Sequence, residues 1–319
     1  MSRPDLLAAA RRGDEAAFER LVDPHRRELH AHCYRMLASV HDAEDALQEA
    51  LLGAWRGMGR FEGRSSLRTW LYTIATNACL RLLERRPKIV LPVDYGPPAD
   101  PHDAIAEPLD ARWLEPYPDE GLGYEQRESV ELAFIAALQH LPPRQRAVLI
   151  LREVLGFSGA EVAEALNTTP GSVYSALQRA HQTVDERLPE QSQQATLRAL
   201  GDERLHELVG AYVAAWERGD VETVVAMLTE DVTLTMPPRP TWFAGRADVA
   251  EFFRVLPLAP GRRWRAVPTT ANGQPAVMKH RWDDDLGRFT PHGVNVLTLR
   301  GAKIASISAF LGTVMPDAT

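Results

Sequence analysis

Residues 41–86 read HDAEDALQEALLGAWRGMGRFEGRSSLRTWLYTIATNACLRLLERR, and this stretch decides the fold class of the first half of the chain. In its first part Leu47, Leu51 and Trp55 recur with a helical period, and acidic residues occupy another stripe. Its last part predicts a second helix, capped by Ser65 or Ser66, with most arginines off the apolar stripe. The apolar positions of that second helix are Leu67, Trp70, Leu71, Ile74, Ala78 and Leu82. The stretch therefore predicts two amphipathic helices, one acidic and one basic.

A second pair of helices is predicted near residue 158. Ser158-Gly-Ala-Glu161 is a capping box, Asn167-Thr168 forms a turn, Thr169 caps the next helix and Pro170 occupies its first position. Two helices joined by a tight turn form a helix-turn-helix, whose second helix can enter the major groove of DNA. Many such hairpins do not bind DNA, so the hairpin alone leaves DNA binding open. The exposed polar positions of the second helix, here called the second-helix set, are Ser172, Tyr174, Ser175, Gln178, Arg179 and Gln182.

Composition places the chain among ordinary globular proteins. It has 319 residues, 45% apolar and 25% charged, which predicts two or three domains. No apolar run reaches the roughly 20 residues that span a bilayer, and the charged N-terminus does not resemble a secretory signal. Two cysteines, Cys33 and Cys79, provide neither a disulfide framework nor the ligand spacing of a metal site. We therefore expect a reduced, cytoplasmic protein without a metal.

Charge is sorted along the chain, although the net charge is only −7. Residues 60–90 hold seven basic and two acidic residues, a balance of +7 − 2 = +5. Residues 92–131 hold eleven acidic and two basic residues, a balance of −11 + 2 = −9. Clustered basic residues are the electrostatic footprint of nucleic-acid binding, so the basic block is the candidate for DNA.

Four segments differ in composition. Residues 5–87 and 128–188 have helical periodicity, and 88–127 form an acidic, Pro-rich linker, since Pro interrupts helices and acidity disfavours a core. Within the tail, residues 200–319, two helices precede β-rich runs with turn signals such as Asn272-Gly273. The fold class expected from these segments is two all-α domains followed by an α+β domain.

Five short motifs, in this order, resemble those of the extracytoplasmic-function sigma factors of bacterial RNA polymerase. They are DAED-x-x-QE at residues 42–49, W-L-x-x-I-A-x-N at 70–77, LP-x-x-QR-x-V at 141–148, EVA-x-x-L at 161–166 and V-x-S-x-L-x-R-A at 173–180. The resemblance extends over roughly residues 5–188. It implies a helical-bundle region 2 and a helix-turn-helix region 4, joined by the linker.

The resemblance also implies a role for each surface. The acidic set would bind the clamp helices of core RNA polymerase: Asp42, Glu44, Asp45, Gln48 and Glu49. The basic set would bind and open the promoter −10 element: Phe61, Arg64, Arg68, Trp70, Asn77, Arg81, Arg85 and Arg86. The second-helix set would bind the −35 element. The acidic linker would thread toward the polymerase active-site and RNA-exit channels, or would be a plain solvated tether.

The tail resembles the SnoaL-like fold, a cone of helices and a curved mixed sheet around a pocket. ANGQPAV at 271–277 and WLEPYPDE at 113–120 resemble motifs of the sigma factors that carry such a tail. A small ligand is a possible occupant of the pocket. The residues expected to line it, the pocket set, are Tyr212, Trp216, Trp242, Met278, His280 and Trp282.

The sequence thus predicts a sigma factor that binds core RNA polymerase and promoter DNA. Its activity would be modulated by the tail through an intramolecular contact with region 2 or the linker. We expect no catalytic residue, no cofactor and no membrane association. Two alternatives remain: a SnoaL-like enzyme fused to a DNA-binding module, which requires His280 as a base, and a ligand-responsive helix-turn-helix repressor. A repressor needs neither the acidic helix nor the basic helix of residues 42–86.

Overall fold

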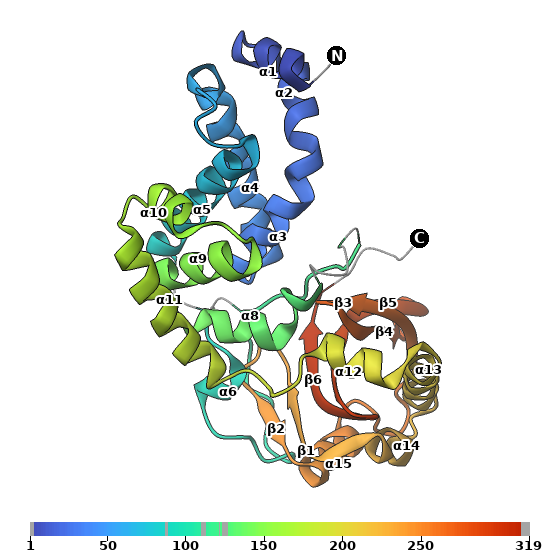
Figure 1. Cartoon of the computed structure of the whole chain (residues 1–319). Helices are drawn as coiled ribbons and strands as arrows, with labels where there is room; N and C mark the ends of the chain where they lie inside the picture. Colours follow the sequence, from blue (N-terminus) through green and yellow to red (C-terminus); the bar gives the residue numbers. More distant parts are fainter. Residues whose placement is uncertain (1–2, 87–88, 110–112, 121, 123–126, 314–319) are drawn as a thin grey trace. The chain divides into compact units, whose positions relative to one another are not determined.

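The computed structural model of the chain describes residues 3–86, 89–109, 113–120, 122 and 127–313 (Figure 1). It divides into two compact units. The helical unit comprises Met1–Lys88 with Ala133–Leu188, and the tail unit comprises Ile89–Leu132 with Pro189–Thr319. The linker therefore belongs with the tail. The expected boundary between region 2 and the linker, at residues 87 and 88, lies outside the described residues, as does the last part of the tail.

The first half of the helical unit is a bundle built around three helices. Helices α3, α4 and α5 pack against one another, and α1 packs against α2. The side chains of Ser39 and Ser66 accept hydrogen bonds from the backbone N–H groups of Asp42 and Thr69, which start α4 and α5. The cap at Ser66 is one of the two that the sequence predicted. The bounds are α1 Arg3–Arg11, α2 Glu15–Val22, α3 Arg26–Leu37, α4 Val40–Gly57 and α5 Leu67–Arg85.

The second half of the helical unit contains the predicted helix-turn-helix. Ser158 and Glu161 form the capping box, Thr169 caps the following helix, and Pro170 is its first residue. Asn167 has a φ of 49°, the left-handed conformation that closes the turn. The bounds are α8 Leu132–Gln139, α9 Pro143–Leu149, a π-helical turn Ile150–Val154, α10 Gly159–Ala165 and α11 Pro170–Asp185.

The tail unit is built on one six-stranded sheet with the order β2-β1-β6-β5-β4-β3. Strands β1 and β6 are parallel and the other pairs are antiparallel, so the sheet is mixed, as expected. The strands are β1 Leu228–Thr235, β2 Trp242–Ala244, β3 Trp264–Ala271, β4 Gln274–Asp283, β5 Arg288–Arg300 and β6 Lys303–Leu311.

Helices cover the sheet of the tail unit (Figure 1). Tyr212 and Trp216 of α13 and Phe253 of α15 are fully buried in the tail core with residues of the strands. Helix α12 was not predicted, and Ser192, its N-cap, is the local signal that precedes it. The helices are α6 Pro92–Tyr95 in the linker, α12 Gln193–Leu200, α13 Asp202–Arg218, α14 Val221–Ala226 and α15 Arg246–Val255.

Within the described residues, no helix is long and apolar enough to cross a membrane. In the same residues no group of His, Cys, Asp or Glu is arranged to hold a metal ion. Cys33 and Cys79 are both fully buried free thiols, and burial raises the pKa of the Cys79 thiol well above its usual value.

Candidate functional site

Most of the acidic set lies on the solvent side of α4. Glu44, Asp45, Gln48 and Glu49 are exposed, but Asp42 is only 3% exposed. Asp42 differs because it lies in the first turn of α4, where its carboxylate forms an ion pair with Arg86, the residue that follows α5. The acidic surface on which a partner could dock is therefore the four exposed residues, without Asp42.

The basic set is less uniform than the sequence suggested. Arg64, Arg81 and Arg85 are exposed, and Arg68, Trp70, Asn77 and Arg86 are half-buried. Phe61 is buried: its ring centroid lies 4.9 Å from that of Trp70, and the Arg11 guanidinium lies 5.7 Å from its centroid. Phe61 and Trp70 thus form an aromatic pair, which exposes little surface for a base to stack on.

The acidic and basic sets are paired with each other. Arg81 Nη2 lies 2.7 Å from Glu49 Oε1, and Arg86 Nη2 lies 3.6 Å from Asp45 Oδ2. These side chains are a third to a half exposed, so water weakens the attraction and a stronger partner can replace it. The two predicted binding surfaces are adjacent along the α4–α5 contact, which the sequence alone did not indicate.

All six members of the second-helix set are exposed on α11. Tyr174 is 69% exposed, an unusual position for a large aromatic ring. Val173, Ala180 and Val184 on the opposite face are buried. The helix therefore presents a polar face with one aromatic ring and one guanidinium, Arg179, which is the residue composition of a groove-reading helix.

Region 4 covers part of the basic set within the helical unit. Asn77 Nδ2 donates to the carbonyl of Ala165 at 3.3 Å, and the Thr69 hydroxyl donates to Glu161 at 3.4 Å. The guanidinium of Arg68 lies 5.3 Å from the ring centroid of Phe157. In this arrangement α10 and the turn before it occupy the polar face of α5 that would have to contact DNA.

Arg146 is an important residue that was not among the predicted contacts. It is 4% exposed, and its guanidinium donates to the carbonyl of Met36 in α3 at 2.5 Å and to Gln139 Oε1 at 2.6 Å. It also donates to the carbonyls of Gln139 and Leu141. Because these acceptors come from both halves of the helical unit, Arg146 ties α9 to α3.

In the tail unit, the linker is bound to the turn between β3 and β4. Asn272 Oδ1 accepts from Tyr117 N at 2.8 Å, Asn272 N donates to Tyr117 O at 2.8 Å, and Asn272 Nδ2 donates to Val130 O at 2.6 Å. Gly273 N donates to Asp119 Oδ1 at 2.7 Å. We call this set of bonds the linker clasp. Asn272 and Gly273 have φ values of 56° and 66°, as a two-residue hairpin turn requires.

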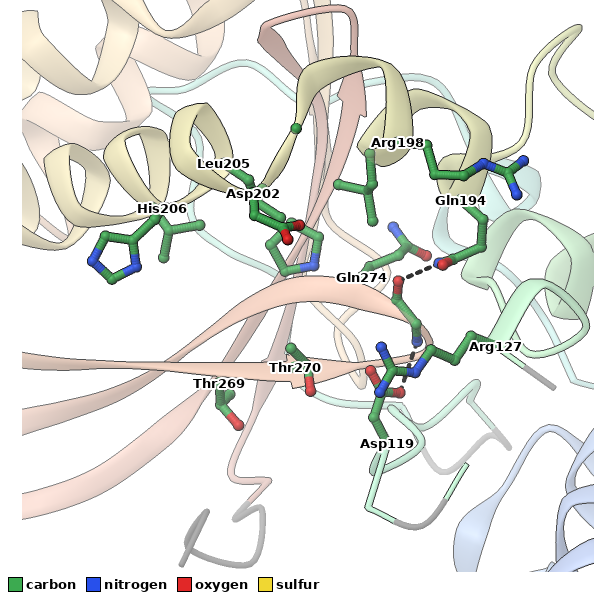
Figure 2. Close-up of a pocket in the computed structure, with 15 residues that line it drawn as sticks. Asp119, Arg127, Gln194, Arg198, Asp202, Leu205, His206, Thr269, Thr270 and Gln274 are labelled. Atoms are coloured by element: carbon green, nitrogen blue, oxygen red, sulfur yellow. Dashed lines mark hydrogen bonds between the residues drawn. The ribbon is translucent and has the colours of Figure 1, made fainter. Parts of the chain in front are cut away.

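Glu131, which follows the linker, extends the clasp to α12. The carboxylate of Glu131 accepts from the backbone N–H groups of Gln193 and Gln194 at 3.0 and 2.7 Å, at the N-terminus of α12. Gln194 Nε2 donates to Gly273 O at 2.6 Å, which connects that helix with the turn (Figure 2). Figure 2 shows Asp119 and Arg127 beside the turn, where they help to line a cavity of about 680 Å³.

Burial changes the acidity of the two clasp carboxyls. Burial raises the pKa of Asp119, and the hydrogen bond from Gly273 N–H partly opposes that shift. Burial likewise raises the pKa of Glu131, opposed by the N–H groups of Gln193 and Gln194. The backbone donors thus offset part of the cost of placing two carboxylates where little water reaches them.

The tail contains a second cavity, of about 400 Å³, between the sheet and helices α13 and α15. Of the pocket set, only Trp216 lines it directly, and Tyr212 reaches it through a hydrogen bond from Asn295 Nδ2, 2.9 Å long. The other four members are not among its described lining residues. From β4 the cavity is lined by Lys279 and Arg281, and the expected Met278, His280 and Trp282 alternate with them. Trp242 instead donates to the linker carbonyl of Gly96 at 2.9 Å.

Three known families match the chain, one for each half of the helical unit and one for the tail. Residues 21–88 match the family model of Sigma-70 region 2, residues 131–183 that of Sigma-70 region 4, and residues 209–307 that of the SnoaL-like domain. No part of the linker between residues 89 and 130 falls in these matches.

Individual relatives agree with the family models. The chain is 41% identical to the ECF RNA polymerase sigma factor SigG of Mycobacterium tuberculosis over 97% of this chain and 84% of that protein. It is 30% identical to the sigma factor SigW of Bacillus subtilis over 57% of this chain and 94% of that protein. The crystal structure of the M. tuberculosis sigma factor SigJ covers 90% of this chain and 93% of its own, with a TM-score of 0.60 and 23% identity, which supports the fold. With both sigma regions in order and a relative that spans the tail as well, the chain belongs to the ECF RNA polymerase sigma factors with a C-terminal SnoaL-like domain.

Proposed function

We propose that the chain joins core RNA polymerase through the exposed acidic residues of α4 and contacts promoter DNA through α5 and α11. The observation that supports this best is the pairing of Glu49 with Arg81 and of Asp45 with Arg86. Glu49, Arg81 and Asp45 are about half exposed, so polymerase and DNA can each replace one half of the Glu49–Arg81 pair. Arg86 is held more firmly, because it also pairs with the buried Asp42. Arg85, also exposed, adds charge to the DNA side.

Assembly with core polymerase tests the acidic surface. The variant Asp45→Ala/Glu49→Ala should lose co-elution with core polymerase in gel filtration. The matched control, Glu15→Ala/Glu19→Ala, removes two exposed carboxylates one turn apart on α2 and should assemble like the wild type. Equal assembly of all three proteins would contradict the proposal for α4. A chain that stops at Pro189, assayed alongside, reports whether the tail favours or opposes assembly.

Promoter contact requires the polar face of α5, which α10 covers in this structure. We infer that region 4 separates from region 2 when the holoenzyme forms, which frees Asn77 and Arg68 for the −10 element. The bonds to be broken are the long ones from Asn77 and Thr69, at 3.3 and 3.4 Å, and the buried one from Arg146 to the Met36 carbonyl. Phe61 and Trp70 would then open as a pair, or serve as the hydrophobic support of a base pocket formed by other residues.

We propose that the tail sets activity through the linker clasp. The linker is the segment that joins the two DNA-contacting regions, and a clasp that holds Tyr117, Asp119 and Val130 limits how far those regions can separate. Asn272→Ala removes the two side-chain hydrogen bonds of the clasp, from Tyr117 N to Oδ1 and from Nδ2 to Val130 O, and leaves the backbone bond to Tyr117 O. A change in promoter-dependent transcript yield with this variant, relative to wild type on purified core polymerase, supports regulation by the clasp, and its sign distinguishes an inhibitory from an activating tail. Unchanged yield would contradict it.

A catalytic tail is the alternative that the sequence left open. It required His280 as a base in the pocket, and His280 is not among the described lining residues of the 400 Å³ cavity. We therefore propose that the tail binds and does not turn over a substrate.

A further inference from the structure

The tail cavity of about 400 Å³ is within the size range of sites for small molecules, roughly 300–1,000 Å³. Its walls are mainly apolar, formed by Trp216, Phe253 and Trp264 with side chains of the sheet. The linker supplies Ile105 and Glu107. Aromatic walls with a few polar groups are typical of a site that binds a small organic molecule.

Lys279 is the polar group that distinguishes this cavity. It is 4% exposed, and its Nζ lies 4.2 Å from the ring centroid of Trp216 and 5.6 Å from that of Trp264. Among the described residues it has no hydrogen-bond or ion-pair partner, which is rare for a buried lysine. The two indole rings stabilise an ammonium through their π faces but cannot replace a carboxylate.

The charges around Lys279 do not neutralise it. Arg239, Arg262 and Arg281 also line the cavity. Of the described lining residues, Glu107 alone is acidic; its side chain is 89% exposed and lies 3.5 Å from the guanidinium of Arg239. The lining is therefore positively charged overall.

Burial in the cavity lowers the pKa values of two lining residues, Lys279 and His292. The pKa of Lys279 falls to about 7 and that of His292 to about 4. His292, whose ring is 5.0 Å from that of Trp264, is therefore uncharged at neutral pH. An anion beside Lys279 would favour the ammonium form and so restore its charge.

We propose that this cavity binds a small organic carboxylate with an apolar body, its carboxylate paired with Lys279 and its body against Trp216 and Trp264. Asn295 provides a second polar contact. Its Nδ2 donates to the Tyr212 hydroxyl, whereas its Oδ1 is buried without a partner among the described residues and can accept a hydrogen bond. A ligand that carries a hydroxyl group as well as the carboxylate would donate a hydrogen bond to Asn295 Oδ1. This inference concerns the tail and does not depend on the proposed roles of α4, α5 and α11.

Calorimetric titration of the full-length chain tests the proposal. The probes are benzoate, 3-phenylpropionate and decanoate, each with its uncharged primary amide. At least one acid should bind saturably, and its amide should bind about tenfold more weakly or worse, because the amide cannot pair with an ammonium. Saturable binding of no acid, or equal binding of acid and amide, would overturn the proposal.

Variants locate the binding. The chain has three lysines, so Lys303→Met, at an exposed site, is a natural control for Lys279→Met. Lys279→Met should weaken acid binding at least about tenfold and should raise the melting temperature, because it removes an unpartnered buried amine. The raised melting temperature shows that the variant is folded. Lys279→Arg should retain acid binding in part. Acid binding that survives in Lys279→Met, or is lost equally in Lys303→Met, would place the ligand elsewhere and contradict the proposal.

Discussion

Gly273 is the residue at which the tail hairpin and the linker meet most closely. Its φ is +66°, and a Cβ there would lie 2.9 Å from the carbonyl oxygen of Arg127 and 3.0 Å from Gln194 Nε2. Gly273→Ala should therefore destabilise the tail unit in two ways: by about 1 kcal/mol for the left-handed backbone, and further by displacing the linker. Thermal unfolding followed by tryptophan fluorescence measures the sum.

A matched variant separates the backbone cost from the cost of displacing the linker. Gly287 has a φ of +61° but nothing within 4 Å of the Cβ position, so Gly287→Ala has only the backbone cost. We expect Gly273→Ala to lower the melting temperature more than Gly287→Ala does. Equal shifts would mean that the linker does not press on the turn.

His32 should make the helical unit sensitive to acid. Burial lowers its pKa to about 3, and its Nε2–H donates to Thr76 Oγ1 at 2.8 Å, because the Thr76 hydroxyl itself donates to Tyr72 O. The unfolded chain, with a His pKa near 6.5, binds the proton more readily than the folded chain does. Stability is therefore lost progressively as pH falls from about 6.5 to about 3, by at most about 5 kcal/mol.

Urea unfolding at several pH values, followed by far-ultraviolet circular dichroism, checks this expectation. His32→Gln keeps an amide N–H that can donate to Thr76 but does not titrate, so its stability should depend less on pH between 6.5 and 4 than that of the wild type. His181→Gln, on the surface of α11, should behave like the wild type. A wild-type pH dependence in His32→Gln would assign the effect to other groups.

The pocket set shows where residue-scale prediction ends. The sequence correctly indicates that alternate residues of β4 share a face, but it assigns Met278, His280 and Trp282 to the cavity, whereas Lys279 and Arg281 line it. A shift of one residue exchanges the two faces of a strand. Residues 274–279 are all buried, so both faces of this part of β4 are covered and no polar face identifies the solvent side.

At the scale of elements, helix starts are predicted best, because their signals are local. Ser66, Ser158 and Thr169 each cap the helix that the sequence assigned to them. Helix α12 was missed because it is only eight residues long, a length that gives a weak periodic signal. The exposure of the second-helix set was predicted correctly, since the buried face of α11 repeats regularly.

Helix α11 carries one arginine on its exposed polar face, so Arg179 should contribute much of its electrostatic attraction to DNA. Arg179→Ala should weaken binding of the holoenzyme to a promoter with a −35 element and should reduce the slope of log affinity against log salt by about one if the contact is to phosphate. Filter binding at several salt concentrations measures both. Arg20→Ala, an exposed arginine on α2, is the control. An unchanged affinity and slope for Arg179→Ala would contradict a role of this residue in DNA binding.

At the scale of the whole molecule, the sequence predicted a contact of the tail with region 2 or the linker, but not which residues make it. Composition predicted a solvated segment, because Pro and acidic residues disfavour a core of their own, and the family resemblance implied a channel-threading one. The structure instead packs the linker on the tail, where Tyr117 and Leu132 bond to Asn272 and Gln274, partners more than a hundred positions away. Such bonds leave no periodic signal. The motif of residues 113–120 indicated that the segment matters, and the structure shows which atoms it contacts.

The linker clasp should protect the linker from proteases. Arg127 is exposed, but its carbonyl is held against the turn and accepts from Val130 N. Cleavage needs an extended backbone, so trypsin can cut after Arg127 only when the clasp opens. Asn272→Ala removes the side-chain bonds to Tyr117 N and Val130 O and should speed this cleavage, measured by mass spectrometry of timed digests of the full-length protein. Asn167→Ala is the matched control, because Asn167 is also a left-handed asparagine but lies in the helix-turn-helix. Equal cleavage rates after Arg127 in the two variants would mean that the linker is held by its other contacts, and the tail would then have to act on transcription by a route other than the clasp.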